Sequence, residues 1–341
     1  MPPPERNRQV YFVGAGLSST AGLPNTPSLI DAVLALAREN RSSVTEEQLL
    51  KAFKFFYPDA VHAGFRPGVV DFFSTLRTFL DVGTGFVETG FTDAPDLYRA
   101  LKVSIARVLL EGTRDVNDAR LINREYLKQI VQPGNIVITS NWDPLIERTA
   151  QVIGVPVRLC GSPADSTLLL LKLHGSIDWC TAGNAKRNLT KADYAWLKEV
   201  LFVDHPYTFA LNDKLRDKEP ELLLRTRCME SWSSAWNVLR SRTIDPHMVT
   251  MVRGKAGDLG PLRDVWRDAY GALSRAKALE IVGYSMPDDD AEIRTLLRAG
   301  IHRGSKNARV TVRNPSPDVH ERVRAFLERS AHSLYLPVEP V

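Results

Sequence analysis

Side chains capable of chemistry follow several short apolar runs. The clearest are Asn141 and Asp143 in ITSNWD (138–143) and His174 in LKLHG (171–175). An amide and a carboxylate can orient water and stabilise positive charge, and histidine can act as a general base near neutral pH. An Asx-rich turn is commonly only a helix cap, and a lone histidine beside a core strand is more often structural. Both interpretations stay open for these residues.

The stretch VYFVGAGLSSTAGLP (10–24) is a buried-strand pattern that runs into a glycine-rich turn. Gly14 and Gly16 permit a tight turn and close approach of the backbone to a phosphate. The dinucleotide fingerprint GxGxxG requires a third glycine where Ser19 stands, so this is not an ordinary dehydrogenase turn. Ser18 either bonds a phosphate or caps a short helix.

Two further strand ends carry polar residues. In IVGYSMPDDD (281–290), Gly283 and Ser285 are placed to receive another part of a nucleotide. The run Asp288–Asp290 suggests a metal, but we prefer acidic residues at a helix N-terminus, where the helix dipole favours them. Asn314 in VTVRNPSP either bonds a ribose hydroxyl or makes an Asx turn.

A parallel sheet is expected to position these residues, because the runs that precede them are apolar throughout and typical of strands buried on both faces. The sequence therefore predicts an α/β fold with a Rossmann-like parallel sheet, whose ligand site lies at the carboxyl ends of the strands. The expected strands are VYFVG (10–14), NIVITS (135–140), LLLLKLHG (168–175), ALEIVGY (278–284) and RVTVRN (309–314), with VPVRL (155–159) and HMVTMV (247–252) as weaker candidates.

Helical periodicity fills the chain between the first two strong strands and predicts four helices, SLIDAVLALAREN (28–40), SVTEEQLLKAFKFF (43–56), PGVVDFFSTLRTFL (67–80) and DLYRALKVSIARVLLEG (96–112). We expect a helical insertion over residues 28–132 that forms a smaller domain, and an irregular, partly helical insertion over about 178–246. The second insertion has a helical pattern at 184–200 and another that carries Trp232 and Trp236. These tryptophans lie four residues apart on one helix face and pack a core or an interface. The Rossmann-like domain then comprises residues 1–27 and 133–330, followed by a tail at 331–341.

Composition excludes several classes of protein. The 341 residues are 44% hydrophobic and 25% charged, with a net charge of +4, which is ordinary for a globular protein and gives no reason to expect nucleic-acid binding. No apolar run is long enough to span a membrane, and the N-terminus has no signal-peptide pattern. The cysteines Cys160, Cys180 and Cys228 form no CxxC pair, so we expect a reduced, cytoplasmic protein without a zinc ribbon.

Five motifs in a fixed order resemble the sirtuin family, and specifically its divergent bacterial sirtuin-like branch. They are GAGLSSTAGLP (14–24), TSNWD (139–143), LHGS (173–176), GYSMPDDD (283–290) and RNP (313–315). Each motif is weak alone, but the ordered set is specific and spans most of the chain.

The resemblance implies that NAD is the ligand and assigns roles to individual residues. Asn141, Asp143 and His174 would be catalytic, acting around the nicotinamide ribose. The NAD-binding residues would be Gly14, Ala15, Gly16, Ser18, Thr139, Gly283, Ser285 and Asn314.

Departures from the deacylating sirtuins imply a different reaction. GLPNTPSL (22–29) replaces the GIPDFR pattern of the deacylases, and the four-cysteine zinc ribbon that shapes their acyl-lysine groove is missing. The GYS form resembles bacterial members that hydrolyse NAD in defence against phage. The resemblance therefore implies an NAD+ glycohydrolase that consumes NAD, needs no metal and releases nicotinamide and ADP-ribose. It also implies a homo-oligomer, with a separate partner such as a HerA-type ATPase or an Argonaute.

Two alternatives remain open at this point. The first is an NAD-dependent protein deacylase or ADP-ribosyltransferase. The second is a non-catalytic subunit that binds NAD or ADP-ribose within a larger complex.

Overall fold

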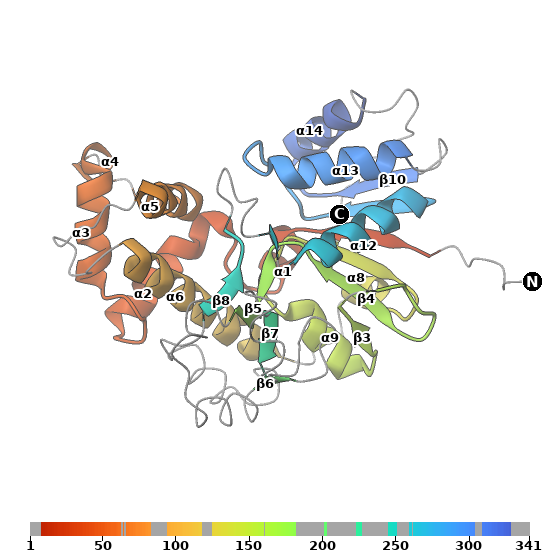
Figure 1. Ribbon diagram of the computed structural model, residues 1–341, viewed down its shortest axis with the longest axis horizontal. Helices are drawn as coiled ribbons and strands as arrows, with labels where there is room; N and C mark the ends of the chain where they lie inside the picture. The colour runs from red at the N-terminus through yellow and green to blue at the C-terminus, as the bar shows by residue number, and fades with distance from the viewer. Residues whose placement is uncertain are drawn as a thin grey trace, which may run out of the picture. The chain divides into compact units, whose positions relative to one another are not determined.

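The computed structural model describes residues 8–62, 64, 66–82, 94–117, 125–159, 161–181, 201–202, 223–226, 245–250, 259–260, 262–303 and 309–328. The chain divides into two compact units (Figure 1). Unit 1 takes Met1–Leu23, Val116–Gly175 and Leu262–Val341, and unit 2 takes Pro24–Asp115 and Ser176–Pro261.

Unit 1 contains a six-stranded sheet in the order β10-β9-β1-β2-β4-β3, in which every pair of neighbours is parallel. The central strand β1 pairs Val10 with Ile136 on one side and with Leu279 on the other. Its side chains are buried on both faces, as expected for a parallel sheet. The α/β fold is confirmed, and the five clear strand candidates and the weaker VPVRL all contribute to this sheet. The strands are β1 (Val10–Val13), β2 (Ile136–Thr139), β3 (Val157–Arg158), β4 (Leu168–Lys172), β9 (Ala278–Val282) and β10 (Arg309–Arg313).

The order in which strands are added to this sheet reverses between β1 and β9, although all of them run in the same direction. From β1 the chain proceeds to β2 on one side of the sheet, and from β9 it proceeds to β10 on the other. Because all six strands are parallel, their carboxyl ends meet at one edge, and β1 and β9 are adjacent there. The candidate residues, which the sequence places after strand ends, therefore lie along this edge of the sheet.

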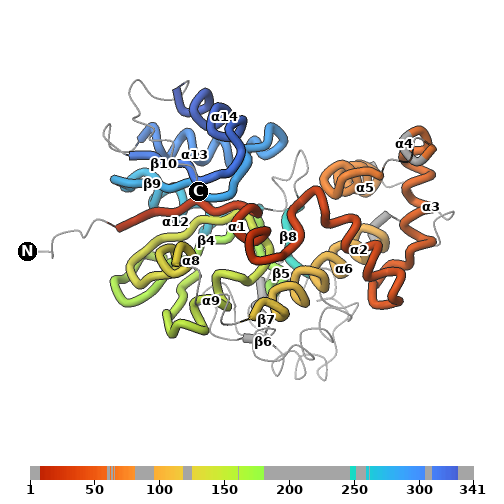
Figure 2. The backbone as a smooth tube through the Cα atoms, turned by 180° about the vertical axis from the view of Figure 1, so that it is seen from behind, coloured from red at the N-terminus to blue at the C-terminus, as the bar shows by residue number. Residues whose placement is uncertain are grey.

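Helices cover both faces of the sheet. Figure 1 shows α12 and α13 on one face, and Figure 2 shows α8 and α14 on the other. Helix α9 is closed by Gly154 in the left-handed conformation, with φ of 74°. The helices are α1 (Ala15–Thr20), α8 (Glu125–Ile130), α9 (Leu145–Ile153), α12 (Arg263–Arg275), α13 (Ala291–Arg303) and α14 (Pro317–Glu328).

Unit 2 contains the four helices predicted from periodicity in its first segment, together with the 3-10 turn η1 (Thr26–Ser28) and a short helix α4 (Pro58–His62). Phe53 and Phe72 meet edge to face in its core, with ring centroids 4.9 Å apart. The predicted helices are α2 (Leu29–Arg38), α3 (Glu46–Phe56), α5 (Val69–Val82) and α6 (Ala94–Asp115).

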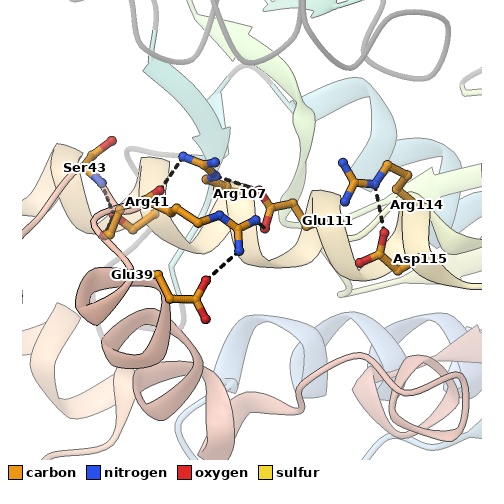
Figure 3. A network of polar contacts seen from close by, with 9 residues as sticks. Glu39, Arg41, Ser43, Arg107, Glu111, Arg114 and Asp115 are labelled. Carbon is orange, nitrogen blue, oxygen red and sulfur yellow. Dashed lines mark hydrogen bonds and ion pairs between the residues drawn. The ribbon is translucent and has the colours of Figure 1, made fainter.

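Surface ion pairs tie α6 to the end of α2 (Figure 3). Arg41 pairs with both Glu39 and Glu111, and Arg107 pairs with the other carboxylate oxygen of Glu111. The Arg41–Glu39 pair is solvent-exposed and contributes little to stability, whereas the side chains of Arg107 and Glu111 are partly buried.

Unit 2 also contains a four-stranded sheet in the order β6-β7-β5-β8, which the sequence analysis missed. The expectation of an irregular, helical stretch over 178–246 is wrong at these strands, and HMVTMV contributes to this sheet rather than to the parallel one. β6 has only two residues, β5 carries the polar side chains Ser176 and Asp178 among its apolar ones, and β5 pairs antiparallel with β7 across more than 40 residues. They are β5 (Gly175–Thr181), β6 (Leu201–Phe202), β7 (Leu223–Thr226) and β8 (Asp245–Met248).

Several sequence features lie outside the described residues. They include Trp232 and Trp236, the helical pattern at 184–200, Cys160, Cys228 and the tail at 331–341. Among the helices that are described, none has both the length and the apolar character needed to cross a membrane.

His247 on β8 makes the stability of unit 2 sensitive to acid. Its ring is buried, and burial, followed by repulsion from Lys102, lowers its pKa from 6.5 to about 3. The unfolded chain binds the proton more tightly, so stability is intact above pH 6.5 and falls as the pH drops toward 3. At pH 5 the loss should be about 2 kcal/mol.

We predict that His247→Leu flattens this acid dependence. Urea unfolding of wild type and variant between pH 7.5 and 4.5 would measure it. The control is His62→Leu at an exposed position of α4. Equal pH slopes for wild type and His247→Leu would contradict the prediction.

Candidate functional site

Three glycines bring the ends of β1 and β9 into backbone contact. The amide of Gly14 donates to Val282 O at 2.9 Å, and the amide of Gly16 donates to Gly283 O at 2.8 Å. A Cβ added to Gly14 would lie 2.6 Å from Cα of Tyr284, and one added to Gly16 would lie 2.7 Å from Cα of Gly283. These glycines are therefore required by the packing of the fold itself, a reason that the sequence analysis had not found.

The start of α1 and the end of β2 share a buried polar group made of Ser18, Asn141 and Asp143. Asn141 Nδ2 donates to Gly14 O at 3.0 Å and to Ser18 Oγ at 3.0 Å. Ser18 Oγ in turn donates to Asp143 Oδ2 at 2.8 Å. Because a backbone carbonyl can only accept, the bond to Gly14 fixes the orientation of the Asn141 amide. Both amide hydrogens are thereby used, and Oδ1 is the atom left to accept from a ligand.

Asp143 also has a structural role. Its Oδ1 accepts from the Leu145 amide at 3.1 Å, so the carboxylate caps the first turn of α9. The helix begins at Leu145, and Pro144 lies just before it rather than in its first turn. The sequence allowed Asp143 to be either a helix cap or a ligand-binding residue. The capping bond uses Oδ1 and does not rule out the second role.

Thr139 links β2 to both neighbouring strand ends. Its Oγ1 donates to Val13 O at 2.9 Å and accepts from the Asn141 amide at 3.0 Å. Its carbonyl accepts from the Leu173 amide at 2.8 Å, which ties the turn that carries His174 to the Asn141 loop. The Leu173 carbonyl is held in turn by Trp266 Nε1 of α12 at 2.9 Å.

A buried ion pair that was not expected from the sequence packs against the loop that carries Asn141 and Asp143. Lys172 Nζ lies 3.0 Å from Glu147 Oε1, and both side chains are almost fully buried. The same ammonium donates to Asp143 O at 2.8 Å and, more weakly, toward Trp142 O. The signal in the sequence was a lysine that ends a run of four leucines, a position where a charge must have partners.

His174 lies against the acidic run that follows β9. Its Nε2 is 3.6 Å from Asp290 Oδ1, and neither side chain is exposed. Asp290 Oδ2 accepts from the Tyr284 hydroxyl at 2.8 Å. Burial, followed by the Asp290 carboxylate, raises the pKa of Tyr284, so its hydroxyl remains a donor at neutral pH. Asp290 does directly precede α13, as expected for acids at a helix N-terminus, but its carboxylate also faces the candidate histidine.

The remaining candidates lie farther along the same edge. Ser285 is exposed, and its carbonyl accepts from Arg322 at 2.8 Å. Asn314 Oδ1 accepts from the Ser316 amide at 3.0 Å, which is the Asx turn considered for it. Ala15 is half-buried at the start of α1.

Within the described residues, no three His, Cys, Asp or Glu side chains are grouped as metal ligands would be. The site is thus a set of hydrogen-bonded polar groups at the carboxyl ends of β1, β2, β4 and β9. In open α/β sheets ligands bind at such an edge, where the strand order reverses.

Comparisons with known proteins give only distant matches. No protein-family model matches the chain, and no curated protein matches it. Among solved structures it is similar to Sir2Tm bound to a propionylated peptide, with 16% identity, 97% of this chain and 88% of that chain covered, and a TM-score of 0.36. It is also similar to a Sir2 mutant with a p53 peptide and NAD, with 17% identity, 96% and 95% covered, and a TM-score of 0.32. At such scores the fold assignment rests on strand order and register.

The contact between Gly283 and the turn after β1 leaves no space for a side chain, so the stability of unit 1 should be sensitive to substitution there. Gly283 has φ of +58°, and a Cβ there would lie 2.5 Å from the Leu17 amide nitrogen. We predict that Gly283→Ala costs about 3 kcal/mol or more, because left-handed strain and backbone overlap add.

The matched control is Gly154→Ala, with φ of +74° and no atom within 4 Å of the added Cβ. It should cost only about 1–2 kcal/mol, from backbone strain alone. Chemical denaturation of both variants measures the difference, and equal losses would contradict the account.

Removing the buried ammonium of Lys172 should be costly. We predict that Lys172→Met lowers the free energy of unfolding by about 3–5 kcal/mol, since it leaves the Glu147 carboxylate buried and uncompensated. Adding Glu147→Leu should recover a substantial part of that loss.

The control is the exposed pair Lys128–Glu125, whose ions are 3.3 Å apart. Lys128→Met should change stability by less than about 1 kcal/mol. Urea unfolding of all four proteins tests the prediction, and a double variant no more stable than Lys172→Met would count against it.

Proposed function

We propose that this chain is an NAD+ glycohydrolase that cleaves the bond between nicotinamide and ribose. The observation that carries the proposal is the hydrogen-bonded group of Ser18, Asn141 and Asp143 at the reversal of strand order. Asn141 and Asp143 are two of the residues that the sirtuin resemblance assigns to the nicotinamide ribose, and it assigns Ser18 to NAD binding.

The bond to be broken already has a good leaving group, because nicotinamide in NAD+ carries a positive charge. The enzyme has to hold the ribose, stabilise the oxocarbenium character that develops on it and position water. In the proposed reaction Asn141 Oδ1 accepts from water or from the nicotinamide amide. The fixed carboxylate of Asp143 stabilises the positive charge, and His174 takes a proton from a ribose hydroxyl or from water.

The burial of His174 favours a second candidate function. Its side chain has no accessible surface, whereas Asn141 retains 8% of its own. For NAD cleavage, the protein must therefore adopt a ligand-bound conformation in which the ribose or a water molecule can contact this ring. A non-catalytic subunit that binds NAD or ADP-ribose has no such requirement.

The biological setting is proposed from the resemblance. An NAD-consuming enzyme of this branch would act in defence against phage by depleting NAD. Its trigger would come through a homo-oligomer or through a separate partner, such as a HerA-type ATPase or an Argonaute.

We predict that Asn141→Ala and His174→Ala each reduce NAD cleavage by at least about 100-fold while the fold is retained. Mass spectrometry of nicotinamide and ADP-ribose would measure it, with the chain alone and together with the products of neighbouring genes. His62→Ala, at an exposed site, is the control.

The outcomes separate the candidates. Full cleavage by both variants would refute the residue assignment. Calorimetric binding of NAD without cleavage, even with partners, would favour the binding subunit. Nicotinamide release that depends strictly on an acyl-lysine peptide would indicate a deacylase.

A further inference from the structure

The acidic run that follows β9 carries one carboxylate unlike its neighbours. Asp288 is exposed on 91% of its side chain and pairs with Arg294, whereas Asp290 is fully buried. A buried carboxylate is costly unless its oxygens are used, so the contacts of Asp290 indicate why it is placed there.

Both oxygens of Asp290 face groups of the site. Oδ2 accepts from the Tyr284 hydroxyl at 2.8 Å, and Oδ1 lies 3.6 Å from His174 Nε2. Tyr284 is itself fixed by edge-to-face packing on Phe12, with ring centroids 4.9 Å apart. Tyrosine, aspartate and histidine thus form a chain that runs from β9 to the turn after β4.

We infer that Asp290 is a positioning residue for His174, holding the ring with its proton on Nε2 and its lone pair on Nδ1. The inference rests on the proposed function for the role of His174. A neutral imidazole carries one proton, and a carboxylate 3.6 Å from Nε2 favours that proton on Nε2 by electrostatic attraction. Nδ1 is then the base that takes a proton from the hydroxyl, and the resulting imidazolium has Asp290 beside it as counter-charge.

The carboxylate is placed by elements other than those that carry the histidine. Asp290 immediately precedes α13, and its carbonyl accepts from the Arg294 amide at 3.1 Å. The turn of His174 is held by Thr139 and Trp266. A change at Asp290 therefore alters the ring's partner without removing the bonds that hold its backbone.

The decisive variant is Asp290→Asn. The asparagine oxygen can still accept from Tyr284, while its NH2 group turns a donor toward Nε2 and favours the opposite tautomer. We expect kcat to fall about 10- to 100-fold with KM for NAD changed less than about threefold. Asp288→Asn removes the same charge at an exposed position and should leave kcat unchanged.

Tyr284→Phe is the second variant, because it keeps the ring on Phe12 and removes only the hydroxyl. Tyr284→Phe should lower kcat as Asp290→Asn does, but by a smaller factor. If Asp290→Asn does not fold, this variant and the wild-type measurement below still decide the inference.

Nitrogen-15 NMR of histidine-labelled protein reads the tautomer directly, with His174 assigned by its absence in His174→Ala. We expect the Nε2–H form in wild type and its loss in Asp290→Asn. An Nδ1–H form or an imidazolium in wild type at neutral pH overturns the inference, and so does an unchanged tautomer in Asp290→Asn. Because this measurement needs no turnover, absence of NAD cleavage would refute the proposed function without affecting the result for Asp290.

Discussion

The close approach of two backbone segments is the constraint on which the rest of the site depends. The turn after β1 and the turn after β9 touch at Gly14, Gly16 and Gly283, with no room for a side chain on any of them. The contact lies where the strand order reverses, so it fixes the ends of β1 and β9 relative to each other. The positions of Ser18 and Tyr284 follow from it, and through them those of Asn141 and Asp290.

Around this contact, charged groups are buried in complementary sets. Lys172 neutralises Glu147 and draws in the carbonyl groups of the Asn141 loop, while Asp290 is satisfied by Tyr284 and faces His174. In a low-dielectric setting such groups interact strongly and cost much if a partner is lost. These polar groups are therefore held in place by the fold, while access to the buried His174 would still have to open for catalysis.

The sequence was sufficient to predict the parallel sheet and four helices of unit 2, because their hydrophobic patterns are strong and local. It was insufficient for β5 to β8, most of which mix polar and apolar residues and which pair over long separations in the sequence. In the site, the motifs identified Asn141, Asp143 and His174 as candidates. For Asp288–Asp290 a helix start was preferred over a metal site, and the contact of Asp290 with His174 was not foreseen, since acidic residues at a helix start look alike whether or not a histidine faces them. Lys172 could have been found from its charge within a leucine run.

The central position of β1 determines when the sheet can form. Its partners are β2 at Ile136 and β9 at Leu279, so one neighbour lies more than 260 residues along the chain. During synthesis β1 emerges before both of its partners, and one of its edges stays unpaired until β9 has been made. Contacts of such sequence separation fold slowly and expose strand edges that associate with other chains. Protection of β1 until β9 is available is thus a consequence of this topology.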